Sequence, residues 1–221
     1  MTPDEILKLL YEETLVGNAP AVKDGVNEGI AMGMDPGTLL YDALIPSLEE
    51  VGARFERGDY FVPEMLIAAR AMQGALNILR PLLAETGTKP IGTFLMGTVK
   101  GDVHDIGKNL VNIMLEGAGF EVIDLGVNVP PERFVEQINE HEPDVVGFSA
   151  FLTTTMPMFK ANINALQKAG IRDKVIVMVG GAPVTQEYAD AVGADGYSAD
   201  ASSAVKKAKD LIEKRRSAVP A

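Results

Sequence analysis

The sequence predicts an α/β fold in which a helical domain is followed by a doubly wound parallel sheet. Two observations predict it. Residues 1–85 carry apolar side chains at helical spacing throughout, whereas short apolar runs alternate with amphipathic segments from residue 91 onward. Such alternation is typical of a parallel sheet covered by helices on both faces. A hydrophobic fraction of 47% in 221 residues is sufficient for a full core.

The first half of the chain contains four predicted helices. The first begins at residues 2–5, TPDE, which supply an N-cap, a proline in the first turn and a capping-box acid. The others are expected at residues 20–33, from 35 through at least 51, and at 64–85. Short connections between the helices indicate a small antiparallel bundle. The stretch TGTKP, residues 86–90, is interpreted as a linker, so the domains are predicted to span residues 1–88 and 89–221.

The second half alternates five predicted strands with five predicted helices. The strands are expected at residues 91–97, 120–126, 144–150, 174–181 and 194–198. The helices are expected at residues 106–119, 130–142, 156–169, 184–192 and 201–215. Five strands in such a fold favour the order 2-1-3-4-5, in which ligands bind at the carboxyl edge of the sheet, at the switch point between the first and third strands.

Composition limits the classes of function. The formal net charge of −11 argues against a nucleic-acid partner, because phosphate contacts need clustered lysine and arginine side chains. The absence of cysteine excludes disulfides and thiolate metal sites. No apolar run reaches the roughly 18–20 residues of a membrane span, and the first residues do not resemble a secretory signal. We therefore expect a cytoplasmic protein with no membrane partner.

One of the two histidines lies in an unusual loop. His104 follows the first strand within GTVKGDVHDIGKN, residues 97–109, two positions after Asp102 and three before Gly107. Ser149 ends the third strand, and a pair of glycines ends the fourth. Because the carboxyl ends of parallel strands meet at one edge, these residues are predicted to line one crevice. The other histidine, at position 141, precedes the third strand and is expected to be an ordinary surface residue.

The residue types at this edge leave several chemistries open, including a structural loop histidine hydrogen-bonded to Asp102. Zinc is disfavoured because its sites use three or four protein ligands. A serine hydrolase is disfavoured because Ser149 follows the acid and the histidine, and Phe151 replaces the second glycine of the nucleophile elbow. A dinucleotide site would need G-x-G-x-x-G after the first strand, and a phosphorylatable receiver domain would need neither the histidine nor the helices. A single axial ligand to a metal with its own equatorial ligands remains, with Asp102 fixing the imidazole tautomer.

The spacing of these residues resembles the corrinoid-binding signature D-x-H-x-x-G…S-x-L…G-G. The matching positions are Asp102, His104, Gly107, then Ser149 after 41 further residues, and finally Gly180 and Gly181. The signature belongs to the cobalamin-binding domains of methionine synthase and to the small corrinoid proteins of one-carbon methyltransferase systems. The resemblance covers essentially the whole chain and implies a four-helix cap followed by a flavodoxin-like (Rossmann-like), five-stranded parallel sheet. Phe151 departs from the signature, which has leucine at that position.

The resemblance implies a corrinoid methyl carrier. Such a protein accepts a methyl group on cobalt(I) from a substrate:corrinoid methyltransferase and donates it to a second methyltransferase, which acts on coenzyme M or tetrahydrofolate. A reductive activator of the corrinoid is a further implied partner. The chain would be a non-catalytic carrier component, and methanol, methylamines, betaines and aryl methyl ethers all remain open as methyl sources. The alternatives are the cobalamin-binding subunit of a corrinoid-dependent isomerase and a cobalamin-sensing protein.

The resemblance also implies that the cobalamin or related corrinoid is held tail-off and histidine-on, with His104 as the axial cobalt ligand. Residues 51–66 resemble the part of the cap that covers the upper face of the corrin, and Thr153 matches a hydroxyl position of the family. The residues implied in cofactor binding are, in the sheet domain, Gly101, Asp102, Val103, His104, Asp105, Gly107, Ser149, Phe151, Leu152, Thr153, Gly180, Gly181, Asp200 and Ala201 and, in the cap, Phe55, Phe61 and Val62.

Overall fold

A computed structural model describes residues 1–85 and 89–218 of the chain. Two compact units divide it: one comprises Met1–Pro90 with Glu116–Gly119, and the other Ile91–Leu115 with the residues from Phe120 onward. The linker predicted at residues 86–90 lies for the most part outside the described residues.

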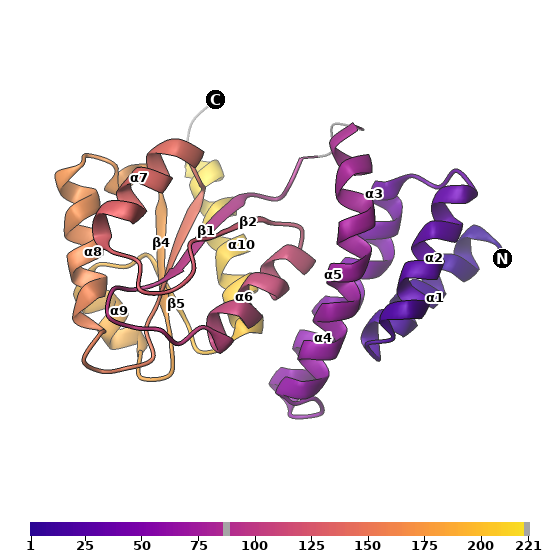
Figure 1. The fold of residues 1–221 in the computed structure, drawn as a ribbon, viewed down its shortest axis with the longest axis horizontal. Helices are drawn as coiled ribbons and strands as arrows, with labels where there is room; N and C mark the ends of the chain where they lie inside the picture. The colour runs from indigo at the N-terminus through magenta and orange to yellow at the C-terminus, as the bar shows by residue number, and fades with distance from the viewer. Residues whose placement is uncertain (86–88, 219–221) are drawn as a thin grey trace. The chain divides into compact units, whose positions relative to one another are not determined.

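The N-terminal unit is helical, as predicted. Its elements are α1 (Pro3–Leu15), α2 (Ala19–Ala31), α3 (Pro36–Leu39), the π-turn η1 (Leu40–Leu44), α4 (Ile45–Arg57) and α5 (Val62–Glu85), shown in indigo to magenta in Figure 1. The predicted capping box begins α1: the Glu5 N–H donates to Thr2 Oγ1 at 3.3 Å, and the Thr2 N–H donates to Glu5 Oε2 at 2.7 Å.

The third predicted helix is a continuous run of α3, η1 and α4 that contains one wide turn. The Ile45 N–H donates to the carbonyl of Leu40, which is five residues back instead of the four of a regular α-helix. The next residue, Pro46, has no N–H, and its ring would clash with the carbonyl four residues earlier in a regular α-helix. The wide turn therefore lets the chain pass the proline without breaking the helix.

The helices of this unit enclose one apolar core. α1 packs against α2 and α4, and α5 packs against the same two helices, which gives the arrangement expected of four helical segments. The largest fully buried side chains of the core are Ile6, Leu10, Leu39, Leu44, Leu48, Met65, Met72 and Leu79. Within each helical run, successive members of this set lie four, five or seven positions apart, about one or two turns, so they fall on one face of the helix.

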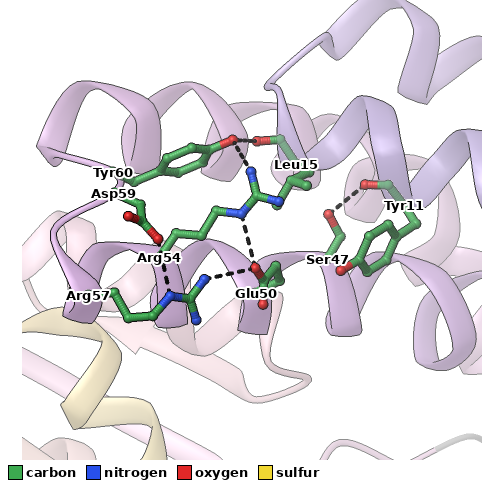
Figure 2. Close-up of polar contacts among 8 residues, drawn as sticks. All are labelled: Tyr11, Leu15, Ser47, Glu50, Arg54, Arg57, Asp59 and Tyr60. Atoms are coloured by element: carbon green, nitrogen blue, oxygen red, sulfur yellow. Dashed lines mark hydrogen bonds and ion pairs between the residues drawn. The ribbon is translucent and has the colours of Figure 1, made fainter.

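A polar network fixes the loop between α4 and α5 (Figure 2). Glu50 Oε1 accepts hydrogen bonds from Arg54 Nε at 3.0 Å and from Arg57 Nη2 at 3.1 Å. Arg54 also donates to the Tyr60 hydroxyl at 3.2 Å, and its guanidinium lies 5.2 Å from the centre of the Tyr60 ring. Tyr60 in turn donates to the carbonyl of Leu15 at 3.3 Å. The network thus connects the α4–α5 loop to the end of α1.

The second unit is a five-stranded, all-parallel sheet in the predicted order β2-β1-β3-β4-β5. The strands are β1 (Thr93–Thr98), β2 (Glu121–Asp124), β3 (Val145–Ser149), β4 (Ile176–Gly180) and β5 (Gly196–Ser198). Thr98 lies opposite Ser149, and Ser149 opposite Gly180. The carboxyl ends of the three central strands therefore finish level with one another, which places the loops that follow them at one edge.

Helices cover both faces of this sheet. They are α6 (Ile106–Gly117), α7 (Pro131–His141), α8 (Pro157–Lys168), α9 (Gln186–Val192) and α10 (Ala201–Ala218), with a short 3₁₀ turn, η2 (Arg172–Lys174). Figure 1 shows α7, α8 and α9 on one face and α6 and α10 on the other. Phe134, Phe148 and Phe159 are fully buried between the sheet and the first group, and the rings of Phe134 and Phe148 meet edge to face at 4.8 Å.

Candidate functional site

The site is built on the loop that leaves β1. The Thr98 hydroxyl donates to the carbonyl of His104 at 2.9 Å, and the Asp102 N–H donates to the carbonyl of Val99 at 3.1 Å, so the loop folds back on the strand end. Gly101 adopts a left-handed φ of 84°, which a glycine accepts at no steric cost. Its N–H donates to Asn128 Oδ1 at 2.8 Å, which connects the loop to the segment after β2.

Asp102 is the centre of the site. Its side chain is fully buried, and both carboxylate oxygens are occupied. Oδ1 accepts from His104 Nδ1 at 2.8 Å and from the His104 backbone N–H at 3.0 Å. Oδ2 accepts from Thr155 Oγ1 at 2.7 Å, and from the backbone N–H groups of Phe151 at 2.8 Å and Leu152 at 3.2 Å. One carboxylate thus joins the loop after β1 to the loop after β3.

These contacts determine the charge of Asp102. Burial raises the pKa of the carboxyl, but the hydrogen bonds from Thr155, His104 and Phe151 outweigh it and hold that pKa well below its ordinary value. The carboxylate is therefore ionised and only accepts, so His104 Nδ1 carries the proton. In the neutral ring, Nε2 then keeps its lone pair.

The imidazole of His104 is held on one edge and on one face. Its side chain is 45% exposed, and Nε2 makes no hydrogen bond within the described part of the chain. The Phe151 ring stacks on it, with ring centres 4.4 Å apart and planes 28° from parallel. The result is a nitrogen donor with a fixed tautomer that remains open to a ligand or to solvent.

Exposed apolar side chains lie on the loops at the same edge of the sheet as this donor. They belong to the loops after β1, β2 and β3 and to the first residue of α6, and they are Val103, Ile106, Val127, Phe151 and Leu152, with exposed fractions between 37% and 76%. Isolated exposed apolar residues are common, but several at the edge of a sheet beside a polar donor indicate a binding surface. The surface suits a ligand with a broad apolar face.

The three glycines of the signature differ in how much the fold itself requires a residue without a side chain. A Cβ added to Gly181 would lie 1.8 Å from the carbonyl oxygen of Ala150, and its φ of 133° is one that other residues rarely adopt. The protein's own backbone therefore requires glycine there. A Cβ added to Gly180 would have only an ordinary contact, 3.5 Å from the Ser198 carbonyl, and one added to Gly107 would meet no atom within 4 Å. The protein's own fold therefore does not require glycine at these two positions.

The hydroxyl that reaches Asp102 belongs to Thr155, which the sequence reasoning did not select. Thr153, the position selected, is exposed. The Thr155 N–H donates to the carbonyl of Leu152 at 3.0 Å, and this turn directs the Thr155 hydroxyl toward the carboxylate. Three consecutive threonines precede α8, and only the burial of the third distinguishes it. Ser149 is half-buried at the end of β3, and its carbonyl accepts from the Val99 N–H at 3.0 Å.

Three further candidates of the sheet unit lie at helix starts. Asp200 caps α10, because its Oδ1 accepts from the Ser203 N–H at 2.8 Å, and Ala201 behind it is buried. Asp105 precedes α6; its Oδ2 accepts from Asn109 Nδ2 at 3.2 Å, and its side chain is exposed beside His104. Asp200 and Asp105 thus each accept a hydrogen bond from the first turn of the helix that follows them.

The candidates of the helical unit lie around the α4–α5 loop. Phe61 is 65% exposed and Val62 is 41% exposed at the start of α5, whereas Phe55 on α4 is half-buried. The Phe61 N–H donates to Glu64 Oε2 at 2.9 Å, which caps α5. Two of the three predicted cap residues therefore present apolar surface to their surroundings.

A buried lysine was also missed. Lys108 is 2% exposed, and its Nζ donates to Asp124 Oδ2 and to Asn109 Oδ1, so its charge is matched by an acid at the end of β2. It anchors the first turn of α6, immediately after the histidine loop. A lysine on a helix is ordinarily a surface residue, so only the structure reveals it.

The donors present fit a corrinoid. Among the described residues, no group of three or more His, Cys, Asp or Glu side chains is placed to hold a metal ion. A corrin brings four equatorial nitrogen ligands of its own and a broad apolar ring, and what it takes from a protein is one axial donor with apolar surroundings. Nε2 of His104 and the exposed apolar side chains beside it supply both.

None of the helices that the structure describes is long and apolar enough to cross a membrane.

Comparisons with known proteins point to the same ligand. Residues 92–206 match a family described as the B12 binding domain, and residues 6–80 match a second family of the same description. The dimethylamine corrinoid protein of Methanosarcina barkeri is 47% identical over 214 residues, which cover 96% of this chain and 100% of that protein. The trimethylamine corrinoid protein of the same organism is 45% identical over 95% of this chain and 97% of that one.

A solved structure agrees over nearly the full length. In the methanol:cobalamin methyltransferase complex MtaBC from Methanosarcina barkeri, one chain is 31% identical and superposes with a TM-score of 0.83, over 95% of this chain and 80% of that chain. The match includes both the helical and the sheet units of this chain.

Proposed function

The chain belongs to the family of B12-binding corrinoid proteins of methyltransferase systems, and from that membership we propose that it carries methyl groups from methylated amines with His104 as the axial ligand of its corrinoid. The single observation that supports this role for His104 is its pairing with a buried, ionised Asp102, which leaves Nε2 as a free donor. When bound, the corrinoid supplies the cobalt that takes up and releases the methyl group.

The residues of this chain contribute ligation and control of a proton. Asp102 keeps the proton of His104 on Nδ1, so that Nε2 presents its lone pair. Thr155 and the backbone N–H groups at positions 151 and 152 keep the Asp102 carboxylate ionised. Nδ1 is thereby engaged with the carboxylate, and Nε2 is the ring nitrogen left open toward the cofactor or solvent.

The remaining predicted residues form the surface for the cofactor. Val103, Ile106 and Leu152 exclude water from it, because their exposed apolar area becomes buried on binding. Gly180 and Gly107 leave space for the nucleotide tail, which we propose is off the cobalt. In the helical unit, Phe61 and Val62 are the apolar residues that we propose to shield the methyl group, with Phe55 beside them.

The names of the relatives support a proposal for the substrate class. Two relatives that match over nearly the full length are named for dimethylamine and trimethylamine, at 47% and 45% identity. We infer a methylamine:corrinoid methyltransferase as the donor partner. A second methyltransferase acting on coenzyme M or tetrahydrofolate and a reductive activator of the corrinoid complete the proposed system.

The experiment that tests the axial ligand uses electron paramagnetic resonance. The protein is produced with ¹⁵N-histidine, loaded with cobalamin and reduced to the cobalt(II) state. We expect a hyperfine splitting from one axial nitrogen that changes with the isotope and is absent from His104→Ala, while His141→Ala behaves like the wild type. A splitting that is the same with ¹⁴N-histidine and with ¹⁵N-histidine would contradict the role of His104. Methyl loading is then compared with mono-, di- and trimethylamine and methanol, each with its own methyltransferase.

A further inference from the structure

The proposed ligation of cobalt by His104 does not by itself account for the contact between the Phe151 ring and the His104 imidazole. The two rings stack with centres 4.4 Å apart and planes 28° from parallel. Phe151 is 51% exposed, so the ring is not there to fill a core. The signature that this chain resembles has leucine at this position, which cannot stack on an imidazole. The stack is therefore specific to the residue that this chain carries.

We propose that Phe151 is a positioning residue, which fixes the plane of the His104 imidazole and so the direction of Nε2. The inference rests on the proposed function, in which Nε2 is the axial ligand. The single hydrogen bond from Nδ1 to Asp102 fixes one edge of the ring, but it leaves the ring free to tilt about that bond. The His104 side chain is 45% exposed, so packing alone does not restrain it. A stacked ring on one face removes the remaining freedom.

Asp102 holds the two residues that carry the stacked rings next to each other. Its Oδ1 holds His104 and its Oδ2 holds the backbone N–H of Phe151, at 2.8 Å in both cases. The imidazole and the phenyl ring are thus attached to opposite oxygens of one buried carboxylate. Because the contact to Phe151 is made by its backbone, it survives any substitution except proline. Removing the phenyl ring therefore tests the stack and leaves the Asp102 network intact.

The expected effect is moderate. An aromatic pair of this kind shifts an equilibrium by about two- to ten-fold beyond the area that it buries. A histidine held in its ligating orientation loses less rotational freedom when it binds, and a histidine without the stack loses more. Phe151→Leu should therefore lower the ratio of histidine-bound to histidine-free corrinoid by about two- to ten-fold.

The test compares Phe151→Leu and Phe151→Met, which remove the ring, with Phe151→Tyr, which keeps it. Leu152→Ala is the matched control, since it shortens the neighbouring exposed apolar side chain. In the protein without corrinoid, ¹³C,¹⁵N-histidine NMR measures the ring-proton shifts and ring mobility of His104. We expect low-frequency shifts and a rigid ring in the wild type, Phe151→Tyr and Leu152→Ala. Both should be lost in the two ring-free variants.

In the cobalamin-loaded protein, the histidine hyperfine splitting of the cobalt(II) state gives the histidine-bound fraction, normalised to the corrinoid bound. An unchanged His104 ring and an unchanged fraction in both ring-free variants would overturn the proposal. A higher histidine-bound fraction would overturn it as well, because the phenyl ring would then obstruct ligation. If the wild type shows no histidine splitting, the proposed function fails at His104, and the NMR comparison still decides whether Phe151 fixes the ring.

Discussion

Each unit of the molecule has a carboxylate that gathers several hydrogen bonds, but the two carboxylates differ in what they bind. Glu50 in the helical unit accepts from two arginines, and its side chain is 31% exposed (Figure 2). Asp102 in the sheet unit is fully buried and accepts from backbone N–H groups, a hydroxyl and an imidazole. Hydrogen bonds from Arg54 and Arg57 hold the pKa of the Glu50 carboxyl below its ordinary value. At Asp102, burial raises the pKa of the carboxyl, but the hydrogen bonds that it accepts outweigh burial and lower that pKa.

The difference shows which network the fold depends on. Solvent and salt screen the ion pairs of Glu50, so their loss leaves groups that water can hydrate. Asp102 is fully buried, so the loss of its carboxylate takes away the acceptor that its backbone and imidazole donors face, whereas the Thr155 hydroxyl can turn to the Leu152 carbonyl at 2.8 Å. Each contact therefore contributes more to stability at Asp102 than at Glu50, and Asp102 also makes more of them.

The largest expected effect is that of Asp102→Asn. The amide brings an NH₂ group toward donors that need an acceptor, so we expect the free energy of unfolding to fall by about 2–4 kcal/mol. Corrinoid affinity should fall by about 10–100-fold, because Nδ1 of His104 would face a neutral amide instead of a carboxylate. Urea unfolding and cobalamin titration measure the two effects. Asp105→Asn, the same change at an exposed neighbour, should leave stability unchanged; equal losses in both variants would contradict a special role for Asp102.

A second effect of the same carboxylate depends on pH. The pKa of Asp102 is lower in the folded protein than the ordinary value of about 4 in the unfolded chain, so its charge stabilises the fold above that value. This contribution is lost as the pH falls below about 4 toward the folded pKa. The difference in unfolding free energy between the wild type and Asp102→Asn should therefore shrink as the pH falls below about 4. A difference that stays constant down to pH 2 would refute the assignment.

A smaller loss is expected for Thr155→Val, which removes the hydroxyl and keeps the shape of the side chain. Asp102 Oδ2 would keep its two backbone donors, so we expect a cost of about 1–2 kcal/mol in urea unfolding. Thr153→Val is the matched control, since its hydroxyl is exposed, and its effect should stay within about 0.5 kcal/mol. The reverse ranking would place the functional hydroxyl at position 153.

The smallest effect is expected for Glu50→Gln. The ion pairs with Arg54 and Arg57 disappear, but both guanidinium groups remain hydrated, so thermal unfolding should change little at physiological salt and not at all in 1 M salt. Calorimetry at the two salt concentrations measures it. A loss as large as that of Thr155→Val would show that the Glu50 network is not screened.

Sequence patterns were sufficient for the features that depend on local order. The alternation of strands and helices, the strand order and the place of His104 after β1 followed from periodicity and from general rules for parallel sheets. The capping box at Thr2 and Glu5 followed in the same way. Each of these depends on residues within a few positions of one another or on the number of elements.

Features that depend on distant contacts were not predictable. Thr155 lies 53 positions from Asp102, and nothing in a run of three threonines tells which one turns toward a buried acid. The stack of Phe151 on His104 depends equally on how two loops meet. The wide turn before Pro46 is an intermediate case, since the proline marks the strain and the fold decides how it is relieved.

The attachment of two loops to one carboxylate also sets an order of events in folding. The amides of Phe151 and Leu152 reach Asp102 across 49 and 50 positions of chain, and the pairing of β1 with β3 lowers the entropic cost of closing that span. These two amides therefore become protected from hydrogen exchange late, after the sheet itself. In a pulse-labelling experiment during refolding, the time at which these two amides become protected would report when the site assembles. The protection of the strand amides would report separately when the sheet forms.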